Sequence, residues 1–185
     1  MKADVLNYRM TDLDGVGIYV GTYAKYNNGN IYGMWIDLNK VGDADEFFEV
    51  CTKLHSDEDD PEFMMQDFQG FPKFLYDESM NKEDVQKILD WISLKKSDQE
   101  ILEDYVDYKG ELDDVYDTLR EAKDRFIGTN LDEVVHNCVV NGILSNIPDQ
   151  KTRDIVETYF KYDEYEREIM NDIIIGEIHG NIFSY

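Results

Sequence analysis

An excess of negative charge constrains this chain more than any other feature of its sequence. The 185 residues include 41 Asp and Glu but only 18 Lys and Arg, so the formal net charge at pH 7 is −23. Like charges at this density repel one another and destabilise a compact chain. High net charge is also typical of disorder, but disordered chains lack apolar residues, whereas 42% of these residues are hydrophobic and 13% aromatic. The sequence therefore predicts a folded, acidic protein.

The sign of the charge limits the partners of the chain. Free nucleic acid and anionic membranes are themselves negative and would repel it. Basic proteins, cations and the DNA-binding clefts of enzymes remain as partners, and solubility or adaptation to salt remains as an alternative use of the charge. Apolar runs such as Ile173–Ile175 are too short to span a bilayer, and no secretory leader is visible. With Cys51 and Cys138 expected as free thiols in apolar helical patterns, we expect a cytoplasmic protein.

The order of apolar and polar segments predicts an α+β chain. We expect an N-terminal extension at residues 1–17, an α+β domain with an antiparallel sheet and a helix at 18–78, a central helical domain at 79–128 and a C-terminal α+β domain at 129–185. No internal repeat and no low-complexity segment is visible in the sequence.

A β-hairpin is the clearest local prediction in the first domain. Residues 18–26 are rich in β-branched and aromatic side chains, Asn28 and Gly29 form a turn signal, and residues 31–38 return as the second strand. A helix follows from Asp43 or Asp45. Residues 63–68 are typical of a third strand, which Gly70 and Pro72 end.

The rest of the chain is predicted to be mainly helical. Ser97, with Glu100 three residues later, matches a capping box. Asn130 is expected to cap a later helix, and Pro148 and Asp149 are expected to begin another. The predicted helices span 81–94, 97–109, 112–126, 130–144, 149–160 and 163–170, and two strand-like runs span 172–177 and 181–185.

Motifs for catalysis or for cofactor binding are absent from the sequence. No HExxH, GxSxG, GxxxxGK[ST] or GxGxxG pattern occurs, and the three histidines are scattered. The acidic stretch that begins at Asp57 fails as an EF-hand, because Pro61 stands where an oxygen ligand is needed and Phe68 stands at position twelve. We therefore expect no cofactor, no metal and no enzymatic activity. A hydrolase that uses two carboxylates or a weakly held metal stays open, because any two of the 41 acids could lie close together.

The acidic residues themselves are the candidate site. A helix rises about 1.5 Å per residue, so acids every three or four residues place charges about 5 Å apart, whereas duplex DNA carries about one charge per 1.7 Å of its axis. Two such helices begin to approach a double row of phosphates. The candidate contact residues are Asp57, Glu58, Asp59, Asp60, Glu62, Glu100, Glu103, Asp104, Asp107, Glu111, Asp113, Asp114 and Asp117.

Several segments resemble the ArdA family of antirestriction proteins. The most specific are the hairpin sequence and a segment that contains the motif DPEFMMQDFQGFP; the others are shorter. The similar segments are Ile18–Gly29, Trp35–Leu38, Asp60–Pro72, Phe126–Gly128 with Leu131–Glu133, and Tyr162–Ile169.

The resemblance implies a function that residue spacing alone does not show. ArdA proteins are DNA mimics carried on mobile genetic elements and phages, with three small domains in an elongated, curved rod that dimerises through one end. The rod occupies the DNA-binding groove of type I restriction–modification enzymes, in their methyltransferase part, and inhibits them by competition without covalent chemistry. The resemblance thus implies a homodimer, and we expect the dimer contact on residues 130–144, which carry Val139, Val140, Ile143 and Leu144. An acidic chaperone or an inhibitor of other basic nucleic-acid-binding proteins is the alternative.

Overall fold

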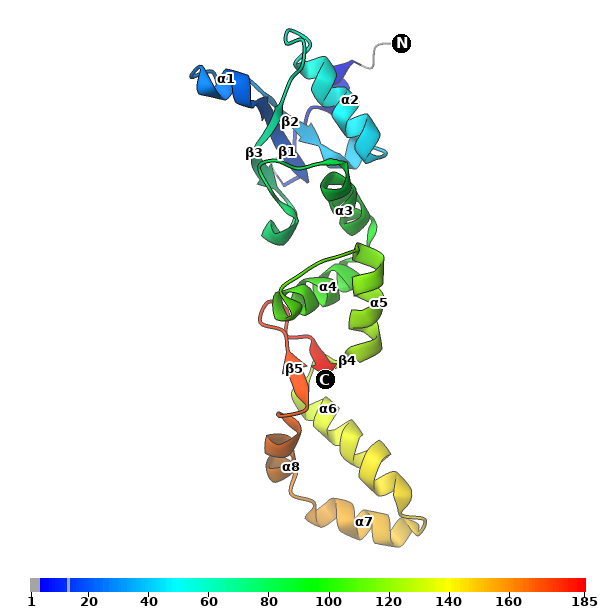
Figure 1. Cartoon of the computed structure of the whole chain (residues 1–185). Helices are drawn as coiled ribbons and strands as arrows, with labels where there is room; N and C mark the ends of the chain where they lie inside the picture. The colour runs from blue at the N-terminus through cyan, green and yellow to red at the C-terminus, as the bar shows by residue number, and fades with distance from the viewer. Residues whose placement is uncertain (1–3, 13) are drawn as a thin grey trace. The chain divides into compact units, whose positions relative to one another are not determined.

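Two antiparallel sheets, one in each half of the chain, organise the fold (Figure 1). The computed structural model describes residues 4–12 and 14–185. The chain divides into two compact units, Met1–Leu94 and Lys95–Tyr185. Within the described residues the fold is mixed α+β, as the sequence predicts. The division into three domains stays a prediction.

The first sheet has the strand order β2-β1-β3, with both pairs antiparallel. Its strands are β1 (Gly17–Thr22), β2 (Met34–Asp37) and β3 (Phe63–Gln69). Ile18 lies opposite Ile36, and Val20 lies opposite Met34 and Met65. All five of these side chains are buried, so β-branched and apolar residues at alternate positions place β1 in the centre of the core.

The predicted pairing of β1 with β2 is confirmed, but the predicted two-residue turn is wrong. The first strand ends at Thr22, and residues Tyr23–Asn27 form the short helix α1. The hydroxyl of Thr22 caps this helix by accepting a hydrogen bond from the backbone N–H of Lys25. This cap overrides the β-propensity of the two tyrosines in α1. Gly29, at φ +76°, supplies the left-handed residue that follows the helix.

Two helices complete the first unit beside its sheet. Asp43 caps α2 (Ala44–Leu54), and Asn81 caps α3 (Lys82–Ser93) with a capping box. The side chain of Lys82 pairs with Asp45, which joins the start of α3 to α2. The buried apolar face of the two helices comprises Phe47, Val50, Cys51, Val85, Ile88 and Trp91. Single 3-10 turns lie at Val5–Tyr8, Leu38–Lys40 and Lys73–Leu75.

The described part of the N-terminal extension contacts this first unit. The hydroxyl of Tyr8 donates to Glu46 at 2.6 Å, and the backbone N–H of Met10 donates to the carbonyl of Trp35 at 2.9 Å. Arg9 forms an isolated bridge with Ile36. Residues 1–3 and 13 of the predicted extension lie outside the described residues.

Two helices open the second unit. They are α4 (Lys96–Lys109) and α5 (Val115–Arg125). The predicted cap at Ser97 is wrong, because α4 begins one residue earlier and its N-cap position, Lys95, makes no capping hydrogen bond. Gly110 ends α4 in the left-handed conformation, at φ +82°.

The second sheet joins a strand that follows α5 with two strands near the C-terminus, in the order β4-β6-β5. Its strands are β4 (Phe126–Gly128), β5 (Ile173–Ile175) and β6 (Ile182–Ser184). The sequence correctly predicts the two final strands, but it extends the preceding helix to Phe126, which instead pairs with Phe183. Phe183 is fully buried against Tyr105 and Ala122, so this aromatic pair anchors the strands on α4 and α5.

Three further helical segments lie between β4 and β5. The cap at Asn130 is confirmed, since its side chain accepts from the backbone N–H of Glu133 at 3.0 Å. The helix that begins there is α6 (Leu131–Asn137), and it continues as one π-helical segment (Cys138–Ile143) and a 3-10 turn (Leu144–Asn146) before α7 (Gln150–Tyr159) and α8 (Tyr162–Ile169). Among the described residues, no helix combines the length and the apolar character needed to cross a membrane.

Candidate acidic interface

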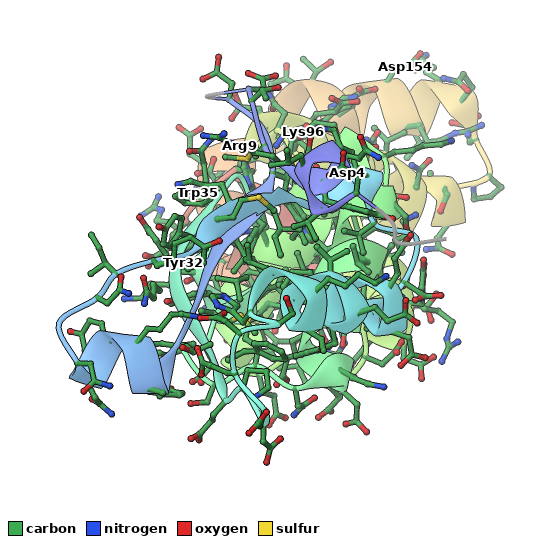
Figure 2. The ribbon with its side chains drawn as sticks, turned by 90° about the horizontal axis from the view of Figure 1, so that it is seen from above. Asp4, Arg9, Tyr32, Trp35, Lys96 and Asp154 are labelled. Atoms are coloured by element: carbon green, nitrogen blue, oxygen red, sulfur yellow. The ribbon has the colours of Figure 1, made fainter. Side chains whose placement is uncertain are left out.

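Negative charge is shared almost equally between the two units. The first unit has eight Lys and Arg and nineteen Asp and Glu, for a net charge of −11, and the second has ten and twenty-two, for a net charge of −12. Side chains tipped with oxygen project from many parts of the ribbon (Figure 2). Each unit therefore presents its own acidic surface.

The first group of candidate residues lies in the segment that joins α2 to β3. We call residues Asp57–Glu62 the acidic loop. Asp59, Asp60 and Glu62 are exposed, and their carboxylates make no ion pair with any described residue. Pro61 stands two residues before the start of β3, where its missing N–H costs no sheet hydrogen bond.

Asp57 and Glu58 differ from their neighbours, because both bind one lysine. The ammonium of Lys25, on α1, lies 2.9 Å from Asp57 Oδ1 and 2.7 Å from Glu58 Oε1. It also lies 3.1 Å from His55 Nδ1. A lysine ammonium has three N–H donors, so each donor of Lys25 has one acceptor. The face of Tyr32 lies 5.3 Å from the same ammonium.

These contacts fix the protonation of the buried His55. Because Lys25 can only donate, His55 Nδ1 must accept. The proton of the neutral ring is then on Nε2, which lies 3.3 Å from the carbonyl of Val20 and donates to it. Burial, together with the positive charge of Lys25, lowers the pKa of His55, so the neutral ring is favoured.

The pKa values of the surrounding charged groups follow from the same contacts. Hydrogen bonds from Lys25 lower the pKa of Asp57 and of Glu58. Burial opposes the charge of Lys25, but hydrogen bonds to Glu58 and Asp57 outweigh it and raise the pKa of the lysine. Three atoms that could bind a metal ion lie within 4.8 Å of one another here, one each from His55, Asp57 and Glu58. The cation that lies among them is the protein's own ammonium group.

The second group of candidate residues begins on α4, where the structure corrects one prediction. Asp104 is fully buried, so the prediction that it belongs to an exposed surface is wrong. Its carboxylate accepts hydrogen bonds from the backbone N–H groups of Ile178, His179 and Asn181 and from the side-chain amide of Asn181, at 2.7–3.0 Å. These four donors explain how a carboxylate can be buried.

The other acids of α4 lie nearer the solvent. Glu103 pairs with His179 at 2.8 Å and is largely covered, whereas Asp107 is exposed. Glu100 lies 3.9 Å from Lys96, one helical turn earlier. Of the four candidates on this helix, Asp107 therefore projects into solvent without an ion pair to any described residue.

The remaining candidates lie at the start of α5. Asp113, Asp114 and Asp117 line a hollow of about 350 Å³ together with Glu121, Asp124 and the basic residues Lys109 and Arg120. Asp114 caps α5 through a hydrogen bond from the N–H of Asp117, and Asp117 pairs with Arg120 at 2.8 Å. Glu111, in the turn before α5, is exposed as well. The structure thus brings three of these four predicted residues to one place.

Sequence reasoning missed the acids of the last third of the chain. Residues 126–185 contain eleven Asp and Glu against four Lys and Arg, a net charge of −7. Exposed carboxylates on α6, α7 and α8 include Asp132, Glu133, Asp154, Glu157, Asp163, Glu164 and Glu168. Counting charge by segment, rather than following the densest helices, would have found them.

A hollow of another kind lies in the first unit. It has a volume of about 530 Å³, and its lining includes Arg9, Tyr19, Tyr32 and Trp35. Figure 2 shows Arg9, Tyr32 and Trp35 near one another on this unit. Its aromatic lining and its basic rim set it apart from the acidic surfaces.

Comparison with known proteins places the chain in a family. No curated protein matches the chain. The family model described as antirestriction protein (ArdA) matches residues 18–181, which is nearly the whole chain and includes the acidic loop, all the helices from α1 to α8 and every strand except β6 and the first residue of β1. The chain belongs to the ArdA family of antirestriction proteins.

Proposed function

We propose that the protein inhibits type I restriction–modification enzymes by occupying the DNA-binding groove of their methyltransferase part in place of DNA. The family supplies the antirestriction role. The observation that carries the mechanism is the excess of exposed carboxylates in both units, with net charges of −11 and −12. A groove that binds phosphates through Lys and Arg attracts such a surface.

The carboxylates lie on ordered elements, which favours mimicry over non-specific attraction. Asp113, Asp114 and Asp117 lie at a capped helix start, and the acidic loop is attached to α1. A surface that is already ordered avoids the conformational entropy that a flexible acidic tail loses on binding. The proposed inhibition needs neither a cofactor nor a catalytic residue, because competition for the groove is sufficient.

We further propose that the protein acts as a homodimer joined through an apolar patch of the second unit. Ile143, Ile155, Tyr159, Phe160 and Tyr165 line a hollow of about 690 Å³ there, and Tyr159 is 80% exposed. Exposed aromatic and aliphatic clusters of this kind are typical of protein interfaces. Of the four residues expected at the contact, Val139 and Leu144 are instead buried inside the unit, and Ile143 is exposed.

The proposed dimer also accounts for the scale of the charge. Two copies carry −46, twice the −23 of one chain. At about one charge per 1.7 Å, this corresponds to roughly 80 Å of duplex DNA. Such a length is enough to fill an extended DNA-binding groove.

Competition between the protein and DNA tests this proposal. A fluorescent duplex that carries the recognition sequence is bound to a purified type I methyltransferase, and the protein is titrated into the complex. We expect full displacement of the duplex at a fixed stoichiometry. If the protein instead binds any basic protein as tightly as it binds the methyltransferase, and heparin displaces it from each of them, the acidic chaperone would be favoured.

A further inference from the structure

We propose that Lys25 is a positioning residue that holds the acidic loop in the arrangement that a basic partner recognises. The proposal rests on the proposed function, and it concerns a positive residue within a negative surface. Lys25 touches no partner in this account. It acts on the carboxylates of Asp57 and Glu58 and, through them, on the rest of the loop.

Each donor of Lys25 has an acceptor, and the side chains of Lys25 and Glu58 are largely covered, whereas Asp57 is 65% exposed. The lysine ammonium has three acceptors, His55 Nδ1 at 3.1 Å, Asp57 Oδ1 at 2.9 Å and Glu58 Oε1 at 2.7 Å, and the lysine side chain is only 12% exposed. Exposed ion pairs contribute little to stability because water competes for both groups. A lysine with every donor occupied and most of its side chain covered is held far more firmly than a surface pair.

The same few residues hold both ends of the acidic loop. The hydroxyl of Thr22 donates to Glu58 at 2.8 Å, near the start of the loop. The backbone N–H of Tyr23 donates to the carbonyl of Glu62 at 3.0 Å, at its end. Thr22, Tyr23 and Lys25 therefore form a clamp at the start of α1. Asp59 and Asp60, between the clamped ends, keep their carboxylates exposed.

Charge alone does not explain the presence of Lys25. Its positive charge offsets one carboxylate in a surface whose proposed purpose is to be negative. If only the number of charges mattered, removing Lys25 would strengthen binding to a basic groove. If the lysine positions the loop, removing it would weaken binding, because the loop would then lose conformational entropy on binding. The two accounts therefore predict opposite changes in affinity when Lys25 is removed.

The test compares Lys25→Met with Lys53→Met in the competition assay with the duplex and the type I methyltransferase. Both substitutions remove one positive charge from the first unit, and among the described residues the ion pair of Lys53 is with Glu49, one helical turn away, at 3.3 Å. We expect Lys25→Met to weaken binding about tenfold, on the scale of ordering a few side chains. We expect Lys53→Met to leave affinity unchanged or slightly increased. Lys25→Arg, which can still pair with both carboxylates, should recover most of the affinity.

A second pair of variants covers the case in which Lys25→Met does not fold. Asp57→Asn and Asp59→Asn each remove one negative charge from the loop, and of these two aspartates Asp57 is the one that binds Lys25. Hydrogen exchange should quicken at the backbone N–H of Glu58, which donates to the carbonyl of His55, in Asp57→Asn but not in Asp59→Asn. The loss of affinity should likewise be greater for Asp57→Asn.

The outcomes separate this inference from the proposed function. If the wild-type protein displaces the duplex while Lys25→Met binds as tightly as Lys53→Met or more tightly, the positioning role is wrong and the mimicry stands. Equal exchange and equal affinity in the two aspartate variants would overturn it as well. If the wild-type protein fails to displace the duplex, the proposed function is wrong, and the role of Lys25 in binding is lost with it.

Discussion

The carboxylate of Asp104 binds Asn181 twice, accepting hydrogen bonds from its backbone N–H at 3.0 Å and from its side-chain amide at 2.7 Å. The two residues lie 77 positions apart, on α4 and in the turn before β6. Gly176, in the same turn, approaches Asp104 so closely that an added Cβ would lie 2.2 Å from its carboxyl carbon. Asp104 therefore fixes the turn that brings β5 and β6 onto α4, and its role is structural.

Replacing Asp104 by Asn should destabilise the second unit. An amide has one oxygen acceptor where the carboxylate has two, and its NH₂ group would face donors. Each buried donor left without an acceptor costs about 1–3 kcal/mol, so we expect a loss of about 3 kcal/mol in the free energy of unfolding. Denaturant unfolding followed by circular dichroism measures it. Asp107→Asn, on the exposed face of the same helix, is the matched control, and equal midpoints for the two variants would show that the Asp104 contacts are unimportant.

The first unit should lose stability as the pH falls below the ordinary pKa of histidine, 6.5. The pKa of His55 is lowered in the folded state, so the unfolded chain binds more protons between that lowered pKa and 6.5, and stability decreases as the pH falls through this range. The lowered pKa values of Asp57 and Glu58 add a second loss below about pH 4.5. Thermal unfolding across pH 3–8 records both.

The variant His55→Gln isolates the first of these two losses. A glutamine side chain can donate to Val20 and accept from Lys25 but does not titrate. Its stability should therefore be flat where the wild type declines just below pH 6.5, while the loss below about pH 4.5 remains. An identical decline in both proteins would exclude His55 as its source. Nitrogen chemical shifts of the wild-type ring should also show the proton on Nε2.

Replacing Tyr159 by Asp should convert the proposed dimer into a monomer. Tyr159 is 80% exposed and lines the apolar hollow of the second unit with Ile155. A charge placed there would have to be buried in the contact without a partner. Sedimentation velocity measures the change in mass, and an unchanged melting temperature shows that the fold is intact. Tyr116→Asp, at an exposed tyrosine on α5, should leave the mass unchanged. If both variants sediment like the wild type, the contact lies elsewhere.

Neutralising several carboxylates together should matter far more than neutralising one. Asp59→Asn, Asp60→Asn or Glu62→Gln alone should weaken binding to the methyltransferase by about twofold, because the field is shared by many charges. The triple variant should weaken it by about tenfold, the product of three small effects. The charge-preserving triple Asp59→Glu, Asp60→Glu and Glu62→Asp is the control. If substituting one carboxylate abolished the inhibition completely, catalysis would be indicated instead.

Features governed by nearby residues were predictable from the sequence. The caps at Asp43, Asn130 and Asp149 are hydrogen bonds to residues three positions away. Residue type and spacing predicted the cap at Asn130, narrowed the first cap to Asp43 or Asp45 and placed a helix start at Asp149. The pairing of β1 with β2 followed from their composition. The helix α1 was missed because the cap at Thr22 competes with the β-propensity of Tyr23 and Tyr26, and local sequence does not show which prevails.

Features governed by distant residues were not predictable. On α4, Asp104 lies among acids that look alike in sequence, and its partners lie 74 to 77 residues later. Asp57 and Asp59 are likewise equivalent in sequence, and only the contact with Lys25, 32 residues earlier, separates them. Charge density could indicate an acidic interface, but it could not show which carboxylates are buried, which are paired and which are exposed.

The salt dependence of competition tests the central claim most directly. Affinities of the protein and of a duplex for the same type I methyltransferase are measured by competition between about 50 and 200 mM salt, a range over which binding to phosphates weakens steeply. We predict that each excludes the other at every concentration and that both affinities decrease steeply with salt. Simultaneous binding of both, or an affinity of the protein that does not change with salt, would contradict the account.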